Sequence, residues 1–151
     1  MDIGSKCGYP ASALSNFAPH EFIFDGVKCN SAEGPLQAFK QKNHEVQIEM
    51  CKLVGYAAKK RGKFLNWQDR QILFWKGKGY LRESKEYQEL LDRLYDALAT
   101  NDSFRRALLA TGNAVLTHSI GRDKERETVL TRKEFCSRLM KLRERMKRGE
   151  I

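Results

Sequence analysis

The sequence of 151 residues has only three prolines and four cysteines, and it contains no long apolar run. A membrane-spanning helix needs about 20 mostly apolar residues in succession. The first ten residues also lack the basic region followed by an apolar segment that marks a protein for export. We therefore expect a soluble protein that does not cross a membrane and that works in the cytoplasm.

The cysteines are scattered, and no two of them form the Cys-x-x-Cys pair that is typical of zinc sites. The three histidines also lie apart from the cysteines in the sequence. Isolated cysteines of cytoplasmic proteins are mostly buried, reduced thiols that pack as small apolar side chains. We expect no metal site and no cofactor. The cysteines concerned are Cys7, Cys29, Cys51 and Cys136.

The sequence has no internal repeat, low-complexity run or proline-rich linker. Its length suits one hydrophobic core, and a content of 41% hydrophobic and 31% charged residues is typical of a globular protein. We therefore predict one domain over residues 1–151, with an irregular lead-in over residues 1–12. Nothing in the sequence indicates an oligomeric state.

Basic residues outnumber acidic ones by 28 to 19, which gives a formal net charge of +9 and a pI near 9.5. This excess favours an anionic partner, such as a phosphate, a nucleotide or nucleic acid, because opposite charges attract over long range. A solvated basic surface explains the excess equally well. Part of the basic excess lies on the outer face of the last predicted helix, and the end of this helix, residues 141–148, is a candidate contact for nucleic acid.

A β-hairpin is predicted over residues 22–29, where Asp25-Gly26 separates two short apolar segments. Apolar residues then recur at helical spacing in several later segments. These patterns predict a mainly helical α+β fold, as a single compact domain with a short N-terminal β-hairpin. The expected helices begin near Glu33 and cover parts of residues 45–62, then 84–100, 103–110 and 131–147, while residues 115–118 are expected to form a short strand.

The segment S-A-E-G-P-L-Q-A-F-K carries an acid, Glu33, and an amine, Lys40, on one predicted helix. Asn30 or Ser31 is the expected cap, and Pro35 is acceptable only near a helix start because it lacks an amide donor. Spacings of three and four residues place the acid and the amine on one surface. An acid that the helix dipole stabilises and a solvated lysine explain the same pattern without any activity.

Residues 14–40 resemble the NADAR family of N-glycosidases, whose members share four motifs in this order. The motifs are a Ser-Asn-Phe element, an Asp-Gly hairpin, Ser-x-Glu at a helix start and Gln-Ala-x-Lys one turn later. The similarity continues through Arg61, Asn66-Trp67, L-L-A-T-G at 108–112, Asp123 and the closing L-M-x-L-R-E, and so covers nearly the whole chain.

The resemblance implies an N-glycosidase and identifies the residues of its site. It implies that Glu33, Lys40, Asp123 and Trp67 are catalytic, with the indole stacking on a base or shielding positive charge on the sugar. The candidate substrate-binding residues are Asn16, Phe17, Arg61 and Gly112. Each assignment has an alternative without function. Asn16 suits an Asx turn, the aromatic residues suit core packing, and Arg61 suits a solvated basic cluster.

The sequence departs from the family pattern directly after Asp123. Most members have Trp-Gly there, whereas this chain has K-E-R-E-T at residues 124–128. The substrate is therefore open between two classes that the family takes, namely an ADP-ribosyl group on guanine in nucleic acid and an early riboflavin-pathway intermediate with a phosphoribosylamine linkage. We expect the nucleic-acid adduct, because the chain is basic and the loop lacks Trp-Gly.

Cleavage of an N-glycosidic bond needs support for the departing base and for positive charge on the anomeric carbon. Glu33 suits a general acid or base, and Asp123 suits the stabilisation of that charge or the orientation of water. Lys40 instead suits a Schiff base with the opened sugar. Two non-enzymatic alternatives are a reader of ADP-ribose or nucleic acid without turnover, and a basic nucleic-acid-binding protein that shares only the fold.

Overall fold

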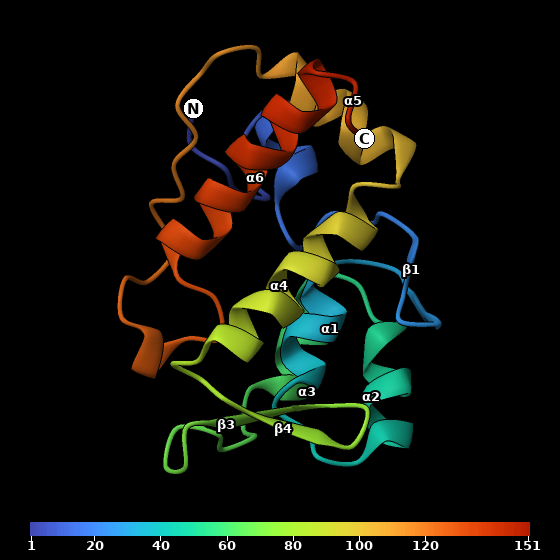
Figure 1. Ribbon diagram of the computed structural model, residues 1–151, viewed down its shortest axis with the longest axis vertical. Coiled ribbons are helices and arrows are strands. Elements are labelled where there is room, and N and C mark those ends of the chain that lie inside the picture. Colours follow the sequence, from blue (N-terminus) through green and yellow to red (C-terminus); the bar gives the residue numbers. More distant parts are fainter.

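The long helix α4, Lys85–Leu98, crosses the middle of the molecule, and the other elements pack around it (Figure 1). It begins where predicted, because the Ser84 side chain accepts a hydrogen bond from the amide of Tyr87. Its apolar residues recur every three or four positions and are buried. The computed structural model describes residues 1–151, and α4 contacts β1, β4 and α6.

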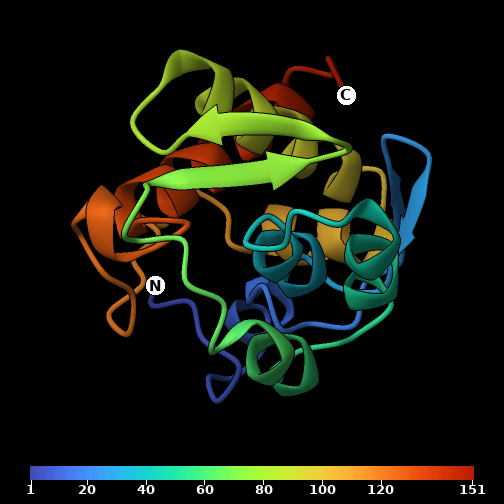
Figure 2. The same ribbon diagram turned by 90° about the horizontal axis from the view of Figure 1, so that it is seen from below.

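The remaining helices are short except for the last. α1, α2 and α3 follow the first hairpin and pack on one another, while α5 and α6 close the opposite end of the molecule (Figures 1 and 2). In chain order the elements are η1 Ala11–Leu14, β1 Phe22–Phe24, β2 Val27–Cys29, α1 Glu33–Ala38, α2 His44–Cys51, α3 Tyr56–Gly62, β3 Ile72–Trp75, β4 Lys78–Leu81, α4, α5 Asp102–Ala110, η2 Glu125–Glu127 and α6 Arg132–Lys147, where η marks a 3-10 helix.

Both sheets are two-stranded antiparallel hairpins. The first is the predicted one, and its turn residues Asp25 and Gly26 have φ angles of 47° and 82°, the left-handed values that a tight hairpin turn needs. The second hairpin, β3–β4, was not predicted. Its turn uses Lys76 and Gly77 at φ 50° and 81°, and a lysine at the first position is a weaker sequence signal than Asp or Asn.

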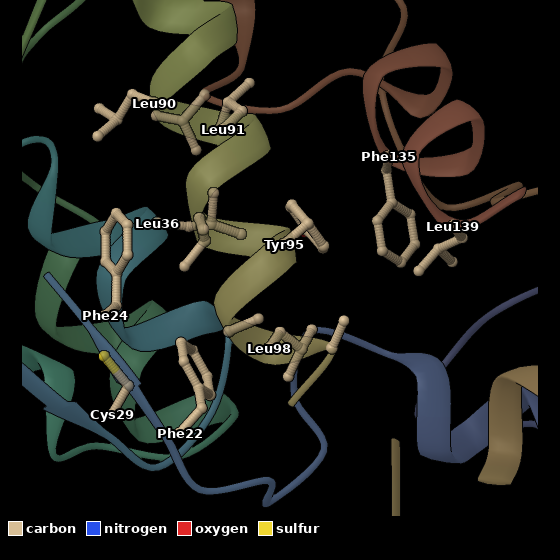
Figure 3. Close-up of a cluster of buried hydrophobic side chains, with 14 of the residues drawn as sticks. Phe22, Phe24, Cys29, Leu36, Leu90, Leu91, Tyr95, Leu98, Phe135 and Leu139 are labelled. Carbon is tan, nitrogen blue, oxygen red and sulfur yellow. The ribbon is translucent and has the colours of Figure 1, made fainter. Parts of the chain in front are cut away.

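The core is one cluster of apolar side chains that joins α4 to α1, the first hairpin and α6 (Figure 3). Leu36 of α1 faces the apolar side of α4 (Figure 3). Phe135 and Leu139 of α6 lie on the other side of α4, toward Tyr95 (Figure 3). Trp75 is a core residue. It stacks on Phe24 at 4.9 Å between ring centroids, and its indole Nε1 donates to Asp25 at 2.9 Å.

Two local predictions were wrong. α1 has no side-chain cap, because Asn30 and Ser31 instead donate to the carbonyls of Lys52 and Leu53 and tie the start of α1 to the end of α2. Residues 115–118 form no strand, since only Thr117 makes an isolated bridge to Asp2. The extended backbone at residue 117 pairs with a single residue and does not become part of a sheet.

The lead-in over residues 1–12 has no regular structure before η1, but it is held along residues 115–119. Ile3 donates to the carbonyl of Thr117 at 2.8 Å, and its side chain is completely buried. The fold class is confirmed as mainly helical α+β in one compact domain with an N-terminal hairpin. No helix is long and apolar enough to cross a membrane. The four cysteines are free thiols.

Candidate active site

A cavity of about 310 Å³ lies between α1, α3, the N-terminal segment and the loop that precedes α6. Segments that are far apart in sequence therefore meet around it. Its lining residues are Ser5, Ser15, Asn16, Phe17, Glu33, Leu36, Gln37, Lys40, Lys59, Trp67, Gln68, His118, Ile120, Gly121, Arg122, Glu127, Thr128, Val129 and Leu130.

Glu33 enters this cavity from the first residue of α1. Its amide donates to the carbonyl of Asn16 at 2.9 Å, which fixes the helix start against the preceding segment. Gln37, one turn later, donates from Nε2 to Oε1 of Glu33 at 2.8 Å, while Oε2 makes no hydrogen bond within the protein. Burial raises the pKa of Glu33, although the bond from Gln37 and the charges of Lys40 and Lys59 oppose the shift.

Lys40 lies in the turn just after α1 rather than on the helix itself. The buried side chain of Gln47 holds this turn, because its Nε2 donates to the carbonyls of Ala38, Gln41 and Phe74 at 2.8–3.0 Å. Burial lowers the pKa of Lys40; Glu33 opposes this shift and Lys59 adds to it.

Glu33 and Lys40 thus share one cavity without forming an ion pair with each other. Each pKa is displaced in the direction that favours the uncharged form. An uncharged carboxyl can donate a proton, and an uncharged amine can attack an electrophilic carbon. The pair is therefore equipped for acid-base chemistry beside a nucleophile.

Asn16, Phe17 and Trp67 complete the part of the site that the sequence predicted. Asn16 accepts a hydrogen bond at Oδ1 from the buried Tyr95 hydroxyl at 2.6 Å, and its NH2 group has no acceptor within the protein. Trp67 is only 3% exposed and belongs to the core as well as to the cavity lining, so core packing is confirmed and the stacking role stays a prediction. Lys59 Nζ lies 6.0 Å from the centre of the Phe17 ring.

Helix α3 lies unusually close to α1 because its last residue is a glycine. A Cβ atom at Gly62 would lie 2.1 Å from Oε1 of Gln37, a contact that no side chain could make without displacing Gln37. At the other end of α3, Gly55 adopts φ 58° against Phe17. The two glycines bring Lys59 to the rim of the cavity.

The far wall, residues 118–130, has only the short η2 as regular structure. It is anchored from behind through its backbone. Arg82 donates from Nε to the carbonyl of Thr128 at 2.8 Å, and the Tyr87 hydroxyl donates to that of Val129 at 2.6 Å. Arg82 is completely buried and forms two hydrogen bonds with Glu134 of α6, at 2.6 and 3.0 Å.

Three predicted site residues lie outside the cavity lining. The Asp123 side chain is 75% exposed and pairs with Arg132 at 3.2 Å. Arg61 is exposed on α3 and does not line the cavity, and Gly112 ends α5, where its carbonyl accepts a hydrogen bond from Lys147 at 2.7 Å. The structure brings these residues neither to Glu33 nor to Lys40.

Other lining residues were missed. Gln37 was part of the predicted motif and Lys59 of the basic cluster, so a signal existed for both. His118, Arg122 and Glu127 had none, because they belong to an irregular wall that only the folded chain brings to the site. No group of three or more His, Cys, Asp or Glu side chains is placed to hold a metal ion.

Comparisons with known proteins agree with this fold. A solved structure, the NMR structure of the E. coli protein YbiA, is similar with a TM-score of 0.62 and 19% sequence identity, over 99% of this chain and 86% of that one. A 17.1 kDa protein from the Gp30-rIII intergenic region of Enterobacteria phage T4 is 40% identical over 148 residues, which are 95% of this chain and 97% of that protein.

The family described as bacteriophage protein GP30.3 matches residues 8–144. This match spans the hairpin, the Glu33 helix, the cavity and most of α6. The chain belongs to the bacteriophage GP30.3 family, which is a NADAR-like family.

Proposed function

We propose that this protein is an N-glycosidase that removes ADP-ribose from guanine in nucleic acid. In this reaction the bond between the anomeric carbon and the guanine nitrogen breaks. Water supplies a hydroxyl group to the sugar and a proton to the base, so free ADP-ribose and an unmodified guanine result.

One observation carries the proposal, namely that Glu33 and Lys40 share a cavity with pKa values displaced toward the uncharged forms. An uncharged Glu33 is poised to protonate the departing nitrogen. Two routes then fit the sugar. Water attacks the anomeric carbon directly, or the sugar ring opens to an imine with the base, the Lys40 amine adds to that carbon and the base leaves. In the second route the sugar is then bound to Lys40 as an imine, and water hydrolyses this imine to release the sugar and the free amine.

The rest of the cavity suits a ribosyl group attached to a flat base. Trp67 and Phe17 offer aromatic surfaces, and the NH2 group of Asn16 has no protein acceptor and is available for a sugar or base oxygen. Lys59 and Arg122 place positive charge at the lining, where a diphosphate would be attracted.

A second substrate class, a phosphoribosylamine metabolite, is favoured by the size of the cavity alone. A volume of about 310 Å³ lies at the small end of the range for ligand pockets and encloses a nucleoside-sized group. Such a metabolite would fit inside almost completely, whereas an ADP-ribosylated strand would extend far beyond the opening.

The experiment is incubation with an oligonucleotide that carries ADP-ribosylated guanine and, separately, with a phosphoribosylamine, followed by chromatography and mass spectrometry of the products. We expect ADP-ribose from the first substrate and no cleavage of the second. Cleavage of the second alone would replace the proposal with the metabolite activity. Binding of ADP-ribose without any cleavage would instead indicate a reader.

A further inference from the structure

The positive charges of α6 are mostly neutralised by neighbouring carboxylates, although its sequence predicted a basic nucleic-acid contact. Arg138 pairs with Asp92 at 3.0 Å and Arg145 with Asp96 at 2.9 Å. The other basic side chains of this helix and its end that form ion pairs are Arg132 with Asp123, Lys147 with Glu144 and Arg148 with Glu150. A phosphate would have to displace these carboxylates, so α6 is a poor surface for it.

Unpaired positive charge gathers instead on α3 and the turn after it. Lys59, Lys60, Arg61 and Lys63 are all exposed, and none of them forms an ion pair. No acidic residue occurs between Glu49 and Asp69 in the sequence, and Glu49 itself already pairs with Lys52. We call residues 55–64, which include these cations, the α3 ridge.

The α3 ridge borders the opening of the cavity. Lys59 lines the cavity, and Arg122, which also has no carboxylate partner, lines it from the opposite wall. Helix α3 packs mainly against α1 and α2 and lies at the lower edge of the molecule in Figure 2, and the exposure of its residues shows that its outer side faces solvent. A chain that enters the cavity therefore has an open cationic path along α3.

Two aromatic side chains stand out from the same ridge. Phe64 is 88% exposed and Tyr56 is 68% exposed, which is unusual for large apolar groups without a partner. Lys63 Nζ lies 5.5 Å from the centre of the Phe64 ring. Exposed rings among lysines are typical of surfaces where unpaired bases stack while cations hold the phosphates.

We propose that the α3 ridge binds a single strand of nucleic acid through the nucleotides next to the base that enters the cavity. This inference rests on the proposed function and names the partner of the same site. The cavity encloses only a nucleoside-sized group, so the rest of a modified strand must lie outside it, and the ridge adjoins the cavity with four unpaired cations and two exposed rings. A single strand fits better than a duplex, because bases within a duplex cannot stack on Tyr56 and Phe64.

The first test measures binding of an unmodified, fluorescently labelled single-stranded oligonucleotide by anisotropy at several salt concentrations. The variant Lys60→Gln/Lys63→Gln is compared with Lys133→Gln/Lys141→Gln, which removes the same charge from two exposed, unpaired lysines of α6. We expect the ridge variant alone to lose affinity, with the slope of log K against log salt smaller by about 1.4, at roughly 0.7 for each phosphate that is no longer neutralised.

The second test concerns stacking. Phe64→Ala should weaken binding by about tenfold, which lies within the range for a base on an aromatic ring, while Phe64→Tyr should restore it. Leu81→Ala, at another exposed apolar position, is the control. An equal loss for the α6 variant, no effect of Phe64→Ala, tighter binding to a duplex of the same sequence, or no binding of the wild type at low salt would each overturn the inference.

Activity separates this inference from the proposed function. The ridge variant should cleave a free ADP-ribosylated guanosine as fast as the wild type does, while its KM for the modified oligonucleotide rises. If the nucleoside is cleaved and the variant has the wild-type KM for the oligonucleotide, the inference about the ridge is wrong and the proposed N-glycosidase activity is supported. If neither substrate is cleaved but binding follows the expected pattern, the ridge stands and the activity fails.

Discussion

At the scale of single residues, Glu33 combines a free carboxylate oxygen with a pKa that burial raises. Its ionisation is therefore costly in the folded protein. A group whose pKa is higher in the folded than in the unfolded state stabilises the fold below the unfolded pKa, and this stabilisation is lost as the pH rises through the folded pKa. The same residue should thus control both turnover and the pH dependence of stability.

We predict that Glu33→Gln lowers turnover by about two orders of magnitude or more, since the amide cannot transfer a proton. The variant keeps an oxygen for the hydrogen bond from Gln37, and its melting temperature should exceed that of the wild type at pH 7. This advantage should shrink toward pH 4, where Glu33 is protonated in both states. Glu83→Gln, at an exposed position, should show neither effect. Full activity of a folded Glu33→Gln variant would remove Glu33 from the mechanism.

Lys40 decides between the two chemical routes. Because its pKa is lowered, more of the amine is uncharged near neutral pH than in an exposed lysine. If the amine attacks the opened sugar, borohydride added during turnover reduces the imine to a stable secondary amine. We then expect an adduct at Lys40 in the intact mass and in peptide maps.

The matched variants for this experiment are Lys40→Ala and Lys42→Ala, because Lys42 is exposed two residues away. We expect Lys40→Ala to lose the adduct and at least about two orders of magnitude in rate, and Lys42→Ala to keep both. An active Lys40→Ala enzyme that yields no adduct would assign the reaction to direct attack by water.

At the scale of elements, the joint between α1 and α2 positions the Lys40 amine. Gln47 is completely buried and satisfies carbonyls from the end of α1, from the following turn and from β3. Hydrophobic periodicity carried no sign of this role. A polar residue on a short helix is normally exposed, and only the fold shows which carbonyls it meets.

Gln47→Leu keeps the volume but removes the side-chain donor of the Gln41 and Phe74 carbonyls, while the Ala38 carbonyl still accepts from the Gln41 amide. We predict a loss of about 1–3 kcal/mol in the free energy of unfolding, measured by urea titration. Turnover should fall as well, because the turn that holds Lys40 loses its anchor. Gln41→Leu, which affects only one exposed hydrogen bond, is the control. Equal stability of the two variants would show that the joint does not depend on Gln47.

Sequence reasoning located elements where a local signal was strong. Asp25-Gly26 marked the first hairpin and Ser84 marked the start of α4, but the Lys76-Gly77 turn carried too weak a signal. The cap of α1 was misplaced because Asn30 and Ser31 found backbone partners 22 residues away. Long-range hydrogen bonds of this kind are not encoded in local spacing.

The candidate site likewise combines residues that local sequence motifs identified with residues that only the folded chain brings to it. Five predicted residues lie in the cavity, since they lie before α1, at its start, in the turn after it or shortly after α3. The opposite wall comes from an irregular segment, and its position depends on Arg82 and Tyr87 behind it. Asp123 fell outside because it pairs with Arg132, while Glu127 of the same segment lines the cavity.

At the scale of the whole molecule, the N-terminal segment supports the far wall of the cavity. Ile3 is completely buried, and its carbonyl lies 2.8 Å from Nδ1 of His118, a lining residue. We predict that Ile3→Ala costs about 2–5 kcal/mol in the free energy of unfolding, because it leaves a cavity in the core. Thermal and urea unfolding measure this.

Ile23→Ala is the matched control, since Ile23 is 60% exposed on β1 and should change stability little. Substrate affinity provides a second measurement, because a loosened lead-in releases residues 117–119 beside the cavity. Unchanged stability of Ile3→Ala would mean that the lead-in contributes nothing to the fold despite its burial.

Glu33 and Lys40 lie in the first third of the sequence, whereas the cavity wall that faces them lies in the last third. Glu33 and Lys40 depend on α1 and α2, whereas residues 118–130 are tied down through backbone carbonyls that any amino acid supplies. Side chains at positions such as 122 and 127 are therefore free to change without loosening the wall. The architecture allows the lining that faces Glu33 and Lys40 to be changed by exchanging one loop, while the two residues themselves stay in place.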